Sequence, residues 1–114
     1  MYFINVLKNM GINPYDYLIV VNYKAKKTGY HEMFFSDDNK HKIMTLDNKG
    51  KIIKFGSSIN NDFIIYNFLE NMGKVKKGTA NIKRNSYLAR ATNIKGEWKK
   101  NKYSKNNLAI NILW

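Results

Sequence analysis

The chain has 114 residues, of which 44% are apolar and 25% are charged, enough for one domain with a hydrophobic core and too few for two. It has no cysteine, which excludes disulfides, cysteine zinc sites and thiol catalysis, and its two histidines cannot form a three-histidine metal site. The formal net charge of +12, from 20 basic and 8 acidic residues, favours a polyanionic partner, with nucleic acid before an anionic membrane surface.

No segment has the pattern of a membrane span or a secretion signal. The longest apolar run, 17–21, is far shorter than the ~20 residues that cross a bilayer. The first ten residues lack a basic start, Asn5 and Lys8 interrupt their apolar stretch, and no small-residue cleavage site follows. We therefore expect a soluble protein that is not secreted and has no membrane partner.

Residues 1–39 predict a helix followed by two strands. Helical spacing of apolar residues, ended by Gly11 and Pro14, predicts a short helix with Phe3, Val6, Leu7 and Met10 on one side. The β-branched and aromatic run 17–23 predicts a strand covered on both faces, and 30–35 predicts a second strand. Residues 26–29 and 36–39 have the composition of turns.

A hairpin is the clearest local feature of the sequence. The segments 41–46 and 51–55 flank Asp47-Asn48-Lys49-Gly50, in which Gly50 can adopt the positive φ of a bulged turn. Asp62 then stands where a helix N-cap belongs, and Gly73 ends the helix. That helix has an apolar stripe of Ile65, Phe68, Leu69 and Met72.

Two further helices are predicted near the C-terminus. One runs from Thr79 to about Thr92, with Ala80, Tyr87, Leu88 and Ala91 inward, and the other is capped by Ser104, with Leu108, Ala109, Ile112 and Leu113 inward. The expected fold is a single α+β domain over 1–114. A small antiparallel sheet of three to four strands is flanked by an N-terminal helix and C-terminal helices.

Charge divides the chain sharply. Residues 1–73, the sheet-rich part, carry 9 basic and 7 acidic residues, whereas 74–114, the helical part, carries 11 basic residues and one acid, Glu97. A bias towards lysine codons would act on both parts alike, so the asymmetry favours a functional basic face.

The basic part combines cations with aromatic side chains, as in proteins that bind nucleic acid. Residues 74–79 form a cationic loop before a helix N-terminus, whose amides and dipole would help to hold a phosphate. Interleaved lysines and aromatics over 95–103 suit stacking on unpaired bases. The alternatives are a solvated helix face, with Tyr87 at the edge of the core, and a Trp98 that fills the core. The candidate binding residues are Lys74, Lys76, Lys77, Lys83, Arg84, Tyr87, Arg90, Lys95, Trp98, Lys99, Lys100, Lys102 and Tyr103.

Catalysis has little support in the sequence. The segment 73–79 imitates a P-loop spacing, but the lysine after the second glycine is missing and a helix precedes it, which argues against nucleotide hydrolysis. His31 and His41 could act as a base and acid in metal-independent RNA cleavage, with Lys42 or Arg90 stabilising phosphate charge. The acidic residues have no nuclease spacing, since turns and a helix cap account for Asp37, Asp38, Asp47 and Asp62. We expect no metal and no cofactor.

From Lys51 onward, a series of motifs resembles a known family. They are Phe55-Gly56, Asp62-Phe63, Arg84 with Tyr87 and Arg90, Trp98, and Leu113-Trp114. Together they resemble short basic proteins of unknown function from nucleocytoplasmic large DNA viruses (giant viruses). The resemblance implies a viral origin and no established activity. The chain departs from the family in having Tyr66 and Ala91 where histidines are usual, and a longer segment between Asp62 and Tyr87.

The sequence thus predicts a viral protein, located in the host cytoplasm or the virion, that binds DNA or RNA without catalysis and largely without sequence preference. With two arginines, bidentate recognition of guanine has few donors. The first alternative is a virion structural or protein-interaction module with a basic face, which meets a virion or host protein. The second is the small ribonuclease based on the two histidines.

Overall fold

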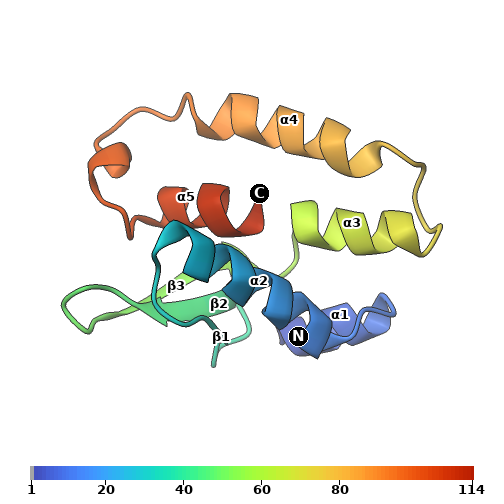
Figure 1. Ribbon diagram of the computed structural model, residues 1–114, viewed down its shortest axis with the longest axis horizontal. Coiled ribbons are helices and arrows are strands. Elements are labelled where there is room, and N and C mark those ends of the chain that lie inside the picture. The colour runs from blue at the N-terminus through green and yellow to red at the C-terminus, as the bar shows by residue number, and fades with distance from the viewer. Residues whose placement is uncertain (1) are drawn as a thin grey trace.

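The computed structural model describes residues 2–114 and has an α+β fold, with a three-stranded antiparallel sheet and five α-helices (Figure 1). The elements in chain order are α1 (Phe3–Asn9), α2 (Pro14–Thr28), β1 (Phe34–Phe35), β2 (His41–Leu46), β3 (Ile52–Ser57), α3 (Phe63–Asn71), α4 (Thr79–Ala91), η1 (Trp98–Lys100), α5 (Lys105–Leu108) and η2 (Ala109–Leu113). The predicted fold class, with an N-terminal helix and C-terminal helices around a small sheet, is confirmed.

The predicted hairpin forms the centre of the sheet. Strands β2 and β3 are antiparallel, with Ile43 opposite Phe55, and β1 pairs with the other edge of β2. In the turn, Gly50 has a φ of 79°, and one Asp47 carboxylate oxygen accepts hydrogen bonds from the amides of Lys49 and Lys51. The hairpin therefore forms where the sequence predicts it, and its turn residues set the register of the two strands.

The strand predicted over 17–23 is wrong, because this segment lies inside helix α2. Asn13 caps the helix by accepting a hydrogen bond from the amide of Tyr15, and Pro14 occupies its first position. Tyr17, Val21 and Ala25 are buried on one side, whereas Ile19 and Tyr23 are exposed. An N-cap, proline in the first turn and an i, i+4 apolar stripe outweigh the β-propensity of the run.

The predictions for the two segments after 17–23 are also affected, because α2 extends into the first of them. Residues 26–28 end the helix instead of forming a turn, and Gly29 terminates it with a φ of 79°. Only Phe34–Phe35 of the predicted strand 30–35 pairs with β2. The side-chain amide of Asn22 explains why residues 30–33 do not join the sheet. Its oxygen accepts a hydrogen bond from the main-chain amide of Met33, and its nitrogen donates to the carbonyl of Met33. These two bonds hold the segment against α2.

The N-caps predicted for α3 and α5 are confirmed. The side chain of Asp62 accepts from the amide of Ile65 at the start of α3, and that of Ser104 accepts from the amide of Asn107 at the start of α5. In α4, Ala80 and Ala91 are buried, whereas Tyr87 and Leu88 are only half-buried. The chain then continues from α5 into η2, a wider π-helical turn.

One hydrophobic core joins the near-neutral and the basic parts of the chain. Ile43 and Phe55 of the sheet and Val21 of α2 share it with Leu108 and Ile112 from the C-terminal segment. Helix α4 runs along one long edge of the molecule, and α5 lies between α4 and the sheet (Figure 1). This arrangement places residues 74–102 on the outside of α3, α5 and the sheet.

Candidate nucleic-acid interface

The candidate cations lie along one long edge of the molecule, which we call the basic edge and define as the segment 74–102. It consists of the loop after α3, helix α4 and the segment that leads to α5 (Figure 1). In the described chain, Lys100 is the one basic-edge cation with a carboxylate within 4 Å, at 3.3 Å from Glu97. The exposed cations of the edge are Lys74, Lys76, Lys77, Lys83, Arg90, Lys95, Lys99, Lys100 and Lys102.

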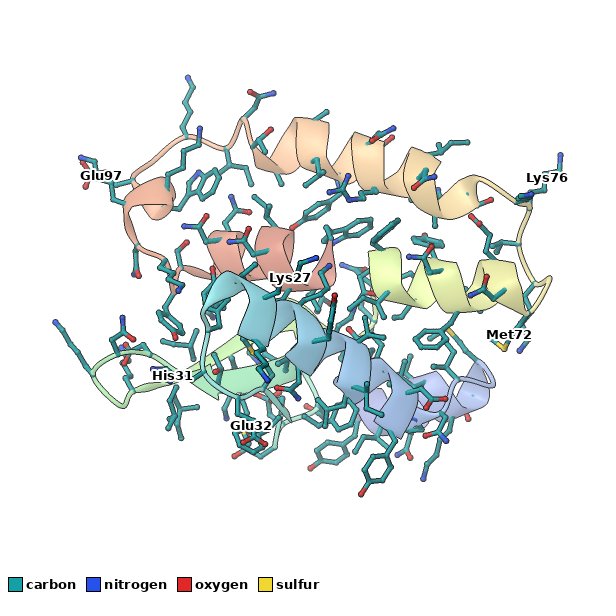
Figure 2. All side chains as sticks on the ribbon, viewed as in Figure 1. Lys27, His31, Glu32, Met72, Lys76 and Glu97 are labelled. Atoms are coloured by element: carbon teal, nitrogen blue, oxygen red, sulfur yellow. The ribbon has the colours of Figure 1, made fainter. Side chains whose placement is uncertain are left out.

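These cations form a row instead of one compact patch. Lys76 and Glu97 lie at opposite ends of the molecule in Figure 2, and α4 lies between them. The longest dimension of the molecule is 41 Å. A row of cations along the longest dimension of the molecule suits an extended polyanion better than a small anion.

Two lysines at the ends of the row are held by backbone carbonyls. The Nζ of Lys74 donates to the carbonyl oxygen of Met10 at 2.5 Å, and the Nζ of Lys102 donates to that of Gly29 at 2.8 Å. The Lys102 ammonium also lies 4.7 Å from the centre of the Tyr30 ring. These contacts anchor the segments flanking α4 to α1 and α2 without neutralising the charges.

The N-terminus of α4 is not the open phosphate site that the sequence predicts. A carboxylate oxygen of Glu70, on α3, accepts a hydrogen bond from the amide of Ala80 at 2.7 Å. The N-cap residue, Gly78, has no side chain to do this and has a φ of 93°. Because an anionic side chain already occupies the positive end of this helix, it is not an open anion site.

Arg84 and Tyr87 on α4 both contact Trp114, the residue that follows η2. The Nε of Arg84 donates to the main-chain oxygen of Trp114 at 2.9 Å, and its guanidinium lies 5.5 Å from the Phe63 ring. The Tyr87 ring stacks on the Trp114 ring, with centres 4.2 Å apart and planes 7° from parallel. Burial raises the pKa of Tyr87, although the nearby Arg90 opposes the shift. Arg84 is thus engaged within the fold, whereas Arg90 remains exposed.

The two other aromatic candidates differ in their surroundings. Trp98 is half-buried, and its indole N–H donates to the carbonyl of Ile94 at 2.7 Å, with the Lys99 ammonium 5.5 Å from its ring. Tyr103 is 6% exposed and packs edge-on against Tyr30 at 5.2 Å. Because its ring faces the core, Tyr103 has no free face for a base, and we leave it out of the interface.

A cleft of about 550 Å³ lies behind the middle of the row. One wall is the inner side of α4, another is the end of β3 with the loop after it, and the third is η2. Its lining residues are Lys42, Gly56, Ser57, Asn60, Asn61, Tyr66, Ile82, Lys83, Ser86, Tyr87, Arg90, Ala109, Leu113 and Trp114. Of this lining, only Lys83, Tyr87 and Arg90 are among the binding residues predicted from the sequence, because segments far apart in the chain (β2, β3 with the loop after it, α3, α4 and η2) form the cleft.

A buried ionic network lies next to the cleft. Lys42 is 2% exposed and Asp62 is 1% exposed, and the Lys42 ammonium donates to Asp62 at 2.8 Å. The hydroxyl of Tyr17 donates to the same carboxylate oxygen at 2.6 Å. Burial, followed by the charge of Asp62, raises the pKa of Tyr17 well above its usual value. Lys42 therefore has a structural partner and does not reach out to a phosphate.

The two histidines lie at opposite ends of the hairpin. His41 begins β2, and its Nδ1 lies 2.9 Å from the Asp38 carboxylate, whose pKa is held well below its usual range chiefly by this hydrogen bond. His31 instead contacts Asn48, in the turn beyond the other end of β2, at 3.2 Å. The six residues of β2 rise ~3.4 Å each, so the histidines do not share one phosphate site in this structure.

Within residues 2–114, no group of three or more potential ligands could hold a metal ion. None of the described helices combines the length and apolar character needed to traverse a bilayer. Comparison with family models, with curated proteins and with solved structures finds no significant match.

Proposed function

We propose that this protein binds nucleic acid without catalysing a reaction on it. The phosphate backbone of the nucleic acid lies along the basic edge. The observation that carries the proposal is a row of exposed cations with a single carboxylate partner among the described residues. Such charges attract a polyanion because each neutralised phosphate releases condensed counterions. For a viral chain, as the resemblance to giant-virus proteins implies, the polyanion would be a genome or its transcripts.

The geometry favours recognition of the backbone over recognition of base sequence. Bidentate contacts to guanine require arginine guanidinium groups in a groove. This chain has two arginines, and Arg84 is engaged with Trp114 and Phe63. The lysines are point charges on flexible stems, which suit phosphates of any sequence. The longest dimension of the molecule, 41 Å, corresponds to roughly 12 base-pair steps of ~3.4 Å.

Charge reversal at the two ends of the row tests the proposal. Lys76→Glu/Lys77→Glu and Lys99→Glu/Lys100→Glu should each weaken binding of a fluorescent 20-base-pair duplex by about tenfold or more, measured by anisotropy at low salt. The matched control is Lys49→Glu/Lys51→Glu, which changes the net charge equally in the exposed hairpin turn. It should weaken binding much less.

Two results would contradict the proposal. Equal weakening by all three double variants would mean that net charge, not the basic edge, governs binding. Absence of duplex and single-strand binding at about 50 mM salt would remove the proposed function. A salt-resistant complex of fixed stoichiometry with a protein would then support the protein-interaction alternative.

A further inference from the structure

The cleft behind α4 has the composition of a site for a ring that carries a negative charge. Tyr66, Tyr87 and Trp114 supply aromatic surface, and Lys83 and Arg90 supply positive charge. The Lys83 ammonium lies 6.0 Å from the Tyr66 ring centre, and the Arg90 guanidinium lies 5.8 Å from that of Tyr87. No acidic residue lines the cleft. Cations and aromatic rings therefore meet in one concave space on the inner side of the basic edge.

Polar side chains on two walls of the cleft have no partner within the protein. In the described chain, the side-chain hydroxyls of Ser57 and Ser86 and the side-chain amides of Asn60 and Asn61 form no hydrogen bond with another protein group, although the main-chain amide of Asn60 donates to the carbonyl of Ser57. Ser57, Asn60 and Ser86 are exposed, and Asn61 is half-buried. Amides and hydroxyls can donate to and accept from the edge of a base. The cleft thus offers ring surface, charge and hydrogen-bonding groups at once.

The floor of the cleft is closely packed. A Cβ atom at Gly56 would lie 2.8 Å from a methyl carbon of Leu113 and 3.3 Å from the side chain of Lys42. Gly56 also has a φ of 79°, which other residues rarely adopt. Glycine therefore lets η2 approach β3, and the cleft volume of about 550 Å³ lies within the ~300–1,000 Å³ typical of small-ligand sites.

We infer that this cleft takes up one unpaired nucleotide of a bound strand, with the base against its aromatic wall and the phosphate near Lys83 and Arg90. The inference rests on the proposed function, because the basic edge must first bring a strand to the cleft. Bases paired in a duplex do not present a free face, so the protein prefers single strands. Stacking of one base corresponds to an affinity gain of about 5- to 150-fold.

The test compares two single strands of equal charge. One is a twelve-residue oligothymidylate, and the other has the same phosphates but an abasic tetrahydrofuran in every position. The wild-type protein should bind the thymidylate strand about 5- to 150-fold more tightly. Ser86→Leu places an apolar side chain in the cleft without changing charge or adding a ring, and it should abolish most of this difference. Asn85→Leu, an exposed neighbour that does not line the cleft, should keep it.

The possible outcomes separate this inference from the proposed function. Equal wild-type binding of both strands would overturn the cleft site while leaving the basic edge intact, whereas binding of neither strand would overturn the proposed function. A difference that survives in Ser86→Leu, or is lost in Asn85→Leu, would also contradict the cleft. Thymidine monophosphate should bind far more weakly than the strand. If it binds more tightly, the ligand is a free nucleotide instead.

Discussion

At the residue scale, three buried polar groups join three elements. The Lys42 ammonium on β2 and the Tyr17 hydroxyl on α2 both donate to Oδ2 of Asp62, and Oδ1 of Asp62 accepts from the first turn of α3. Each charge is compensated by the other, and the carboxylate is also hydrogen-bonded by a hydroxyl and an amide. Removing one charge would leave the other buried without its partner.

Asp62→Asn should therefore lower the free energy of unfolding by about 3–5 kcal/mol, measured by urea denaturation. Asparagine is a good N-cap, so the loss reports the missing charge and not a missing cap. The control is Lys54→Met, which removes a partly exposed pair with Asp37 and should cost at most about 1 kcal/mol. Similar losses in the two variants would contradict the buried network.

The raised pKa of Tyr17 predicts sensitivity to alkaline pH. The unfolded chain loses this proton near pH 10 whereas the folded chain retains it, so stability is full below about pH 10 and falls as pH rises towards the folded pKa. Tyr17→Phe should be less stable at neutral pH but should lose less stability than wild type above pH 10. Thermal unfolding midpoints of both proteins from pH 7 to 11 measure this, and parallel curves would contradict it.

At the element scale, Glu70 on α3 accepts a hydrogen bond from the first turn of α4, across the loop that separates the two helices. Glu70→Ala should cost about 1 kcal/mol of stability, since it removes the acceptor for the Ala80 amide and a negative charge from the helix N-terminus. Glu97→Ala is the control, because among the described residues the exposed Glu97 pairs only with the exposed Lys100. Urea denaturation of both variants measures the difference, and equal stability would show that Glu70 does not cap α4.

The elements that could be predicted from sequence are those whose ends are marked by turn-forming or helix-capping residues nearby in the chain. The hairpin has Asp47 and Gly50 in its turn, and α3 has Asp62 as its cap, so neighbours in the chain determine both. Helix α2 was missed because the composition of 17–23 favours a strand, although Asn13 and Pro14 mark a helix start. The short β1 depends on Asn22 holding Met33, a contact that no local pattern reveals.

At the scale of the whole molecule, the basic edge was visible in the sequence but the cleft was not. Charge segregation past residue 73 is a property of the linear chain. Trp114 reaches Tyr87 and Arg84 only because η2 folds back beneath α4. Ser57 at the end of β3 and Asn60 in the loop after it become walls of the cleft for the same reason. Long-range packing therefore determines the site more than any motif does.

The salt dependence of binding tests the proposed function most directly. If the row of cations contacts a duplex at four or five phosphates, the logarithm of the association constant should fall with the logarithm of salt concentration with a slope of about −4. Anisotropy of a labelled 20-base-pair duplex from about 50 to 200 mM salt measures this slope. Submicromolar binding at the lowest salt with a slope of about −4 is the expected result. A slope near zero, or no binding of this duplex or of a single strand of equal length at about 50 mM, would contradict phosphate binding along the basic edge.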